Sequence, residues 1–240
     1  DLATLPTTGG PAAHVDLAAP LIDVEVADEG APGGTTTQRY FVPTALVWDE
    51  TLVSPGAPLL PFTLAKIRRG PRLGALVDAT AIDETARAIV DDMGRDRTVD
   101  TLNGGKLVFR AGAGLAELEI GGDDEIRRMG VEQSNTSILV GEKGVLKLYR
   151  KLSTGIHPEL EIGRFLTDVA GYANVPPLLG TLEHIDPSGE PTALAVLQGF
   201  VRNQGDGWSF TQDYLARELD ELRLGIGNGE MPVDERHAAY

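Results

Sequence analysis

The sequence predicts an α+β fold in which a mostly antiparallel module is followed by a β-β-α-β-β unit and a final helix. Three observations support this prediction. Short segments of alternating apolar and polar residues recur between Gly- and Pro-rich loops over residues 1–122, as in half-buried strands. Two apolar strands, a helix and two more apolar strands follow within residues 123–201. An amphipathic helical pattern then begins at Trp208.

The elements of the first module follow from local patterns. Residues 1–20 are small and rich in Pro and Gly, and they predict a loosely ordered segment. Residues 82–94 carry apolar side chains at a spacing of 3.6 residues and predict a helix that ends at Gly94. Pro43 interrupts one of the strands. Strands are expected over residues 21–29, 39–50, 63–70, 73–81, 106–114 and 115–120.

The second module is more apolar. A helix is expected over residues 158–172, with Pro158 in its first turn. A second helix is expected over residues 208–225, and Asp206 is placed to cap it. The strands of this module are expected over residues 136–141, 145–152, 175–186 and 191–201, with a turn at residues 142–144.

Composition excludes several classes of function. The 240 residues include 21 Lys and Arg against 36 Asp and Glu, so the net charge is −15. Such a surface is unsuited to nucleic acid or to an anionic membrane, because both require clustered positive charge. The absence of cysteine excludes disulfides, thiolate zinc sites and a cysteine nucleophile. No apolar stretch reaches the length of a membrane span, and we expect a cytoplasmic protein.

Lys147 stands among the apolar residues of the strand predicted over residues 145–152. A strand lysine commonly keeps its ammonium in water, but its neighbours favour another role. A small polar string precedes it, a helix with two glutamates follows it, and the last strand leads to a Gly-containing connector. Protein-kinase-like N-lobes have this order: a strand lysine binds ATP phosphates and a helix glutamate orients it. The polar string expected to cover the phosphates is Ser134, Asn135, Thr136 and Ser137, and the connector expected to contact adenine is Gln198, Gly199, Phe200 and Val201.

Two segments resemble the bacterial maltokinases, in particular those fused behind trehalose synthase. They are "EQSNTSILVGEKGVLKLYRKLSTGIHPELEIGRFLTDVAGYANVPPLLGTLEH" and "LAVLQGFVRNQGDGWSFTQDYL". The family is related to aminoglycoside phosphotransferases, and the resemblance extends over nearly the whole chain from Leu21. It implies a cap domain over residues 1–122, a kinase-like N-lobe over residues 123–201, and a linker with the start of a C-lobe over residues 202–240.

The resemblance also implies a reaction and partners. The γ-phosphoryl group of ATP would pass to maltose, with Mg²⁺, to give maltose 1-phosphate for trehalose and α-glucan metabolism. A trehalose synthase domain or subunit is the implied partner. Lys147 would be the phosphate-binding lysine. Glu161 would be its helix partner, preferred over Glu159 because the "EIGRFL" context matches the family.

The catalytic aspartate and the metal-binding aspartate of the family lie in its C-lobe, and neither motif occurs here. None of the four histidines begins the required pattern. We therefore expect a fragment with no catalytic residue and no metal ligand, inactive alone. Two alternatives remain open at this stage. One is a kinase for another sugar, such as glucosamine. The other is a non-catalytic module that docks a trehalose synthase partner.

Overall fold

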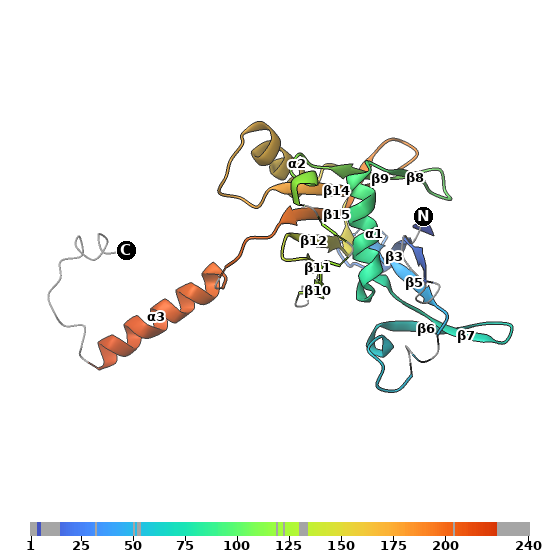
Figure 1. Cartoon of the computed structure of the whole chain (residues 1–240), viewed down its shortest axis with the longest axis horizontal. Coiled ribbons are helices and arrows are strands. Elements are labelled where there is room, and N and C mark those ends of the chain that lie inside the picture. The colour runs from blue at the N-terminus through green and yellow to red at the C-terminus, as the bar shows by residue number, and fades with distance from the viewer. Residues whose placement is uncertain are drawn as a thin grey trace. The chain divides into compact units, whose positions relative to one another are not determined.

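The computed structural model describes residues 4–5, 15–31, 33–49, 51, 54–118, 120–121, 123–129, 134–203 and 205–224. The chain forms two compact units, residues 1–200 and residues 201–240. Figure 1 shows the course of the chain through both. Within the described residues every strand pair is antiparallel. The protein is therefore a mixed α/β protein with mostly antiparallel sheets, as the sequence predicts.

Two smaller sheets contain the N-terminal strands of the first unit. Pro43 lies between β4 and β5 and separates two strands that enter different sheets, because proline cannot donate a ladder hydrogen bond. The five-stranded sheet has the order β1 (Thr4–Leu5), β2 (Val15–Ala18), β5 (Thr44–Val47), β7 (Arg72–Asp78) and β6 (Thr63–Arg69). The three-stranded sheet has the order β13 (Lys151–Leu152), β4 (Thr35–Phe41) and β3 (Leu21–Ala27).

The largest sheet has seven strands and contains Lys147. Its central strands β12 and β15 are almost entirely buried, which fits their apolar sequences. The order is β10 (Ile126–Arg128), β11 (Asn135–Val140), β12 (Gly144–Tyr149), β15 (Pro191–Gly199), β14 (Leu178–Ile185), β9 (Lys106–Ala111) and β8 (Thr98–Asp100).

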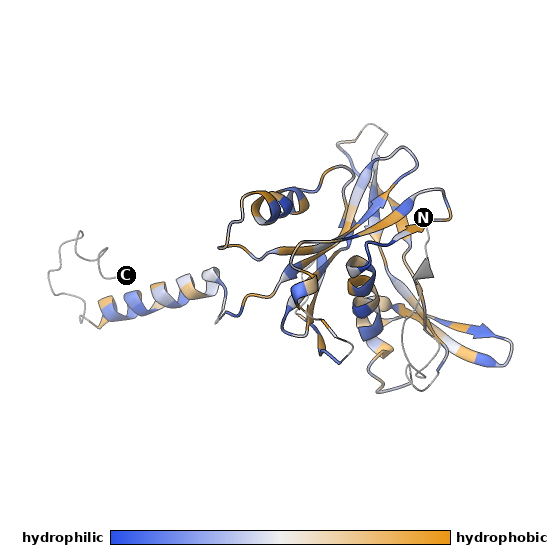
Figure 2. Cartoon of the chain, turned by 45° about the horizontal axis from the view of Figure 1, so that its top comes forward, coloured by the Kyte–Doolittle hydropathy of each residue, from blue (hydrophilic) through white to orange (hydrophobic). Residues whose placement is uncertain are grey.

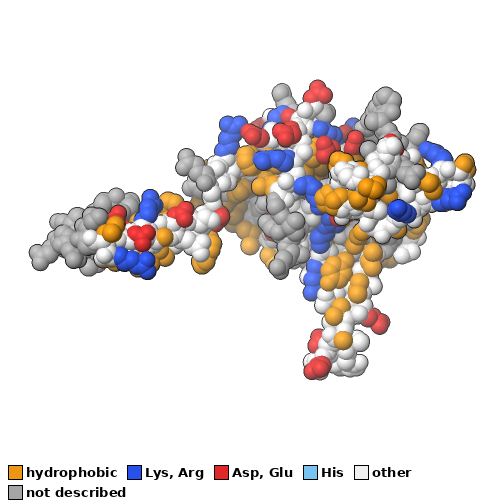
Figure 3. Space-filling view, turned by 90° about the horizontal axis from the view of Figure 1, so that it is seen from below, with side chains coloured by type: hydrophobic (Ala, Val, Ile, Leu, Met, Phe, Trp, Pro, Cys, Tyr) orange, Lys and Arg blue, Asp and Glu red, His pale blue; other side chains and the backbone are white. Residues whose placement is uncertain are grey.

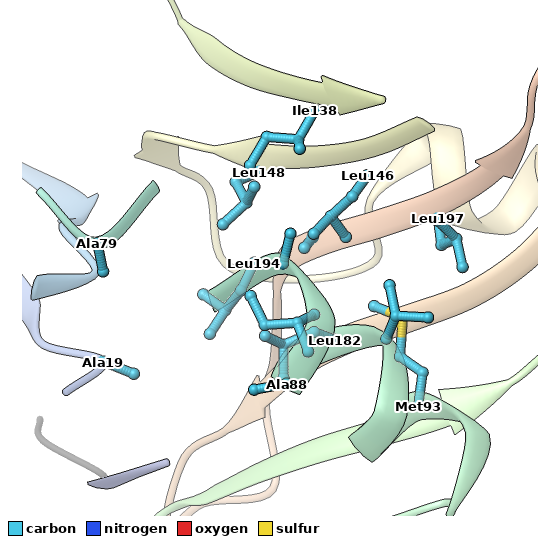
Figure 4. Packing of buried hydrophobic residues seen from close by; sticks show 14 of the residues in the cluster. Ala19, Ala79, Ala88, Met93, Ile138, Leu146, Leu148, Leu182, Leu194 and Leu197 are labelled. Atoms are coloured by element: carbon cyan, nitrogen blue, oxygen red, sulfur yellow. The ribbon is translucent and has the colours of Figure 1, made fainter. Parts of the chain in front are cut away.

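Helix α1 (Asp83–Gly94) packs on one face of this sheet. Its buried Ala88 and Met93 face Leu146, Leu182 and Leu197 of the sheet (Figure 4). Gly180 on β14 permits this approach, because a Cβ there would lie 2.7 Å from the Met93 sulfur. The hydrophobic core therefore includes α1 and the central strands, and it continues into the five-stranded sheet through Leu17, Ala45 and Val77.

Helix α2 (Pro158–Arg164) follows β13 and continues as a π-helical segment, η5 (Phe165–Val169). The segment predicted as one helix over residues 158–172 is therefore a short α-helix followed by a wider turn. Three further short helices are 3₁₀: η2 (Leu60–Phe62), η3 (Ala79–Ala81) and η4 (Ala116–Leu118).

The second unit contains helix α3 (Gly207–Arg223). Asp206 caps it as predicted: its carboxylate accepts hydrogen bonds from the backbone N–H and the hydroxyl of Ser209. Hydrophobic and hydrophilic residues alternate along α3 (Figure 2).

Several predictions about elements were wrong. Val15–Ala18 lies in the segment predicted to be loose, yet it is strand β2 and pairs with β5. The alternation at residues 115–120 predicted a strand, but the chain turns into η4 there. The strands β8 and β10 were not predicted, since each is only three residues long. Strands β8 and β9, before residue 122, belong to the same seven-stranded sheet as β10, β11 and β12, after it.

Basic side chains at residues 66–72 lie on the hairpin of β6 and β7, with Gly70 at positive φ in its turn. In Figure 3, Lys and Arg side chains, drawn in blue, gather on the right, where Figure 1 shows this hairpin. Among the described residues, no helix combines the length and apolar character needed to cross a membrane.

Candidate functional site

Lys147 lies in the middle of β12, opposite Ser137 of β11 and Val196 of β15. Side chains alternate between the two faces of a strand. Leu146 and Leu148 therefore enter the core, and Lys147 projects from the opposite face. The rigid central strands fix the backbone of the lysine on both sides.

Helix α2 brings a glutamate to this lysine. The Lys147 ammonium nitrogen lies 3.1 Å from Oε2 and 3.3 Å from Oε1 of Glu159. The two side chains are 24% and 27% exposed, so the pair is neither sealed in the core nor fully solvated. A partly exposed ammonium with one carboxylate partner retains donors for a further anion.

The preference for Glu161 was wrong, because Glu159 makes the contact. Residues two apart on an α-helix point in nearly opposite directions. With Leu160 buried against the sheet, the carboxylate of Glu159 turns toward β12, and Glu161 is exposed.

Tyr149 also contacts Glu159. It lies two residues after Lys147 on the same face of β12, and its hydroxyl donates a 2.6 Å hydrogen bond to Glu159 Oε2. The ring of Tyr149 packs against the imidazole of His157, with 4.4 Å between centroids. The Lys147 ammonium lies 5.7 Å from the centroid of the tyrosine ring. Sequence reasoning missed Tyr149; the available signal was its position two residues from the lysine.

Other contacts fix α2 against the sheet. Nδ1 of His157 accepts a 3.3 Å hydrogen bond from the Glu159 backbone N–H and caps the helix. At the other end of the helix, Arg164 donates to Glu183 at 2.7 Å and to Thr181 at 3.2 Å, both on β14. The carboxylate of Glu159 is therefore positioned by a helix that is anchored to the sheet near both ends.

The electrostatics favour an ionised glutamate. Burial alone would raise the pKa of the Glu159 carboxyl, but the hydrogen bonds from Tyr149 and Lys147 and the lysine charge together lower this pKa. Burial, and then the bond to Glu159, strongly raise the pKa of the Tyr149 hydroxyl, so it stays protonated and remains a donor. Burial lowers the pKa of His157, which fits its use of Nδ1 as an acceptor.

The polar string before Lys147 is mostly part of the sheet. Asn135, Thr136 and Ser137 belong to strand β11, and Ser137 is buried. These three residues pair with β12, and the strand predicted over residues 136–141 begins one residue earlier, at Asn135. Only Ser134 precedes the strand, and residues 130–133 lie outside the described residues.

Thr136, which was expected to cover the phosphates, contacts the side chain of Arg150. Its hydroxyl accepts a 2.9 Å hydrogen bond from Nε of Arg150. The same guanidinium donates to Asp78 at 2.7 Å and to Thr80 at 2.9 Å. The backbone N–H of Arg150 donates to the Ser134 carbonyl at 2.9 Å. Arg150 thus ties the start of β11 to the end of β7.

The connector begins later than predicted. Gln198 and Gly199 are the last residues of β15, so only Phe200 and Val201 lie beyond the strand. The N–H groups of Gly199 and Phe200 donate to the carbonyls of Pro177 and Lys143, both at 2.9 Å.

The described part of the chain contains no group of three or more His, Asp or Glu side chains that could hold a metal ion. The chemistry available among these residues is that of an anion-binding site: one ammonium, oriented by a carboxylate and backed by a neutral hydroxyl.

Comparison with known proteins supports a kinase-like fold. No protein-family model matches the chain. A solved structure described as a glucosamine kinase in complex with glucosamine, ADP and inorganic phosphate aligns with 98% of this chain at 19% identity, with a TM-score of 0.50. A glucosamine kinase in crystal form A aligns with 95% of this chain at 19% identity, with a TM-score of 0.46. The chain spans only 42% and 40% of these two chains. At this identity the likeness shows a shared fold.

Proposed function

We propose that this chain is the ATP-binding part of a sugar kinase. The observation that carries the proposal is the ion pair between Lys147 on a central strand and Glu159 on the helix that follows it. In protein kinases a strand lysine paired with a helix glutamate binds the phosphates of ATP. The order β11, β12, α2, β14, β15 supplies this pair in the sequence that such an N-lobe requires.

Each residue would have a defined task. The Lys147 ammonium would bind phosphate oxygens, and Glu159 would keep that ammonium pointed at them. Ser134, which precedes β11, would be the part of the polar string that covers the phosphates. The connector from Gln198 to Val201 would contact adenine, as the resemblance implies. Mg²⁺ neutralises phosphate charge in such reactions, and the maltokinase resemblance assigns its ligands and the catalytic aspartate to the family's C-lobe.

Two acceptors have separate support. The sequence resemblance favours maltose, which would give maltose 1-phosphate in trehalose or α-glucan metabolism. The likeness in fold to a glucosamine kinase favours glucosamine. A trehalose synthase partner, a cytoplasmic location and a separate role for residues 1–122 as a cap follow from the resemblance and composition, and they remain part of this proposal.

The decisive experiment measures ADP release by the full-length product of the gene that encodes this chain. ATP and Mg²⁺ are supplied with maltose, with glucosamine, or with no sugar. We expect release that depends on one of the two sugars. Lys147→Ala should reduce it by about 100-fold or more, because the phosphates lose their only ammonium from β12.

Arg68→Ala is the matched control, since Arg68 lies on the distant β6 and its side chain donates to the Gly70 carbonyl within its own hairpin. We expect wild-type turnover from it. Wild-type turnover in Lys147→Ala would contradict the nucleotide-binding role. No release with any sugar by the wild type would instead favour a non-catalytic module that docks a partner.

A further inference from the structure

We propose that Tyr149 is a positioning residue for nucleotide binding, because it holds the Glu159 carboxylate while Lys147 engages a phosphate. This inference rests on the proposed function. Tyr149 and Lys147 project from the same face of β12, and both contact Glu159. Their shared acceptor is Oε2, which lies 2.6 Å from the tyrosine hydroxyl and 3.1 Å from the ammonium.

The hydrogen-bond distances to Glu159 differ between its two donors, Lys147 and Tyr149. Charge-assisted N–H···O bonds are usually about 2.7–2.9 Å long and O–H···O bonds to a carboxylate about 2.5–2.7 Å. The contacts from Lys147 to Glu159, at 3.1 and 3.3 Å, are longer than that range, whereas the bond from Tyr149 falls within it. The tyrosine therefore sets the position of the carboxylate more tightly than the lysine does.

Tyr149 is itself well fixed. Its side chain is buried, and its ring packs against His157, the residue that caps α2. The tyrosine thus connects β12 to the start of the helix through two contacts, one to the ring of His157 and one to the carboxylate of Glu159.

A neutral donor suits this position. A second cation beside Glu159 would compete with Lys147 for the carboxylate and would itself attract phosphate. The tyrosine hydroxyl contributes a hydrogen bond without a charge and stays protonated. When the ammonium turns toward a phosphate, Glu159 keeps one strong partner and does not become a half-buried carboxylate without a hydrogen bond.

Tyr149→Phe in the full-length gene product tests the inference. It removes the hydroxyl and keeps the ring that packs against His157. KM for ATP should rise by about five- to tenfold while kcat changes by less than about twofold. Glu159 would lose a donor to its charged form, so the acid limb of kcat/KM for ATP should move to higher pH.

Tyr40→Phe is the matched control. The Tyr40 hydroxyl also donates a hydrogen bond, 2.7 Å long, but to Gln38 on β4. An effect of Tyr149→Phe no larger than that of Tyr40→Phe, with an unmoved pH limb, overturns the positioning role and leaves the proposed function intact. A wild type without ATP-dependent activity overturns the proposed function, and the role of Tyr149 in nucleotide binding with it.

A measurement on the unmodified protein covers the case in which Tyr149→Phe does not fold. The ¹³Cζ resonance of Tyr149 reports on the hydrogen bond of its hydroxyl. We expect this resonance to stay in place when ATP is added, since Tyr149 keeps Glu159 as its partner. A resonance that moves to the position of an unbonded tyrosine on ATP addition would overturn the inference.

Discussion

The two residues of the Lys147–Glu159 pair come from regions that differ in packing: Lys147 lies on a strand with a buried face, and Glu159 lies on a helix that is largely exposed. Strand β12 lies between β11 and β15, and Leu146 and Leu148 are completely buried under it. The segment α2–η5 buries Leu160, yet it leaves large apolar side chains exposed: Ile162, Phe165 and Val169. The lysine is therefore fixed by a packed sheet, whereas the glutamate is fixed mainly by individual polar contacts.

This difference shows where the site can be perturbed. The core beneath Lys147 is closely packed, so even a small loss of side-chain volume there lowers stability. The position of Glu159 depends on a few named bonds, from Tyr149, from the His157 cap, and from Arg164 to β14. Changes in the first region should cost stability, and changes in the second should mainly alter nucleotide binding.

The largest expected effect compares one apolar truncation in each region. Leu146→Ala should lower the free energy of unfolding by about 2–5 kcal/mol, because it creates a cavity in the core. Ile162→Ala removes a side chain that is 55% exposed and should change it by about 0.5 kcal/mol or less. Urea unfolding of both variants measures the difference. Equal losses would contradict the contrast in packing.

A smaller effect is expected where the sheet meets the N-terminal strands. Asp78→Asn removes the charge opposite Arg150 and weakens a largely buried network, so stability should fall by about 1–3 kcal/mol. Asp23→Asn is the matched control, because its pair with Arg39 is more exposed, and it should cost at most about 1 kcal/mol. Thermal unfolding compares the two. A larger loss of stability in Asp23→Asn would show that the Arg150 hydrogen bonds are not a main link between β11 and β7.

The start of α2 should respond to the loss of its cap. His157→Ala removes both the acceptor for the Glu159 N–H and the ring against Tyr149, and it should cost about 1 kcal/mol. His157→Asn can restore the cap but not the ring, so it should recover part of that loss. Urea unfolding distinguishes them. Identical stability of the Ala and Asn variants would mean that the cap contributes nothing.

The smallest expected effect is a pH dependence of stability. The pKa of Glu159 is lower in the folded protein than its ordinary value. Its contacts therefore stabilise the protein above the ordinary glutamate pKa, and this contribution is lost as pH falls through the folded pKa. Glu159→Gln should weaken the acid dependence of unfolding, and Glu161→Gln should keep it. Equal curves for the wild type and Glu159→Gln would contradict the pKa shift.

The sequence predicts central strands such as β12 and β15 well, because their nearly continuous apolar residues are typical of strands that are buried on both faces. It does not predict Ile126–Arg128, a triplet with two arginines that is a strand because β11 pairs with it. Nor does it predict that the alternation at residues 115–120 becomes a helical turn. At Ile126–Arg128 a strand pairing distant in the sequence decides the structure, and a local pattern does not contain it.

The candidate site shows the same limit. The position of Lys147 on a strand and the presence of a glutamate partner on the next helix follow from the order of elements. The choice between Glu159 and Glu161 does not follow from that order, because the two lie on opposite sides of Leu160, each about 100° from it around the helix axis. Only the contacts of α2 with Tyr149 and β14 fix which glutamate meets the lysine.

The most direct test of the central claim is KM for ATP in Glu159→Gln and Glu161→Gln, measured in the full-length gene product with the sugar that supports turnover. The two variants carry the same substitution two residues apart on the same helix. If the Lys147–Glu159 pair binds nucleotide, Glu159→Gln raises KM for ATP by about tenfold or more and Glu161→Gln leaves it unchanged. Equal values in the two variants, or a larger rise in Glu161→Gln, would contradict the account.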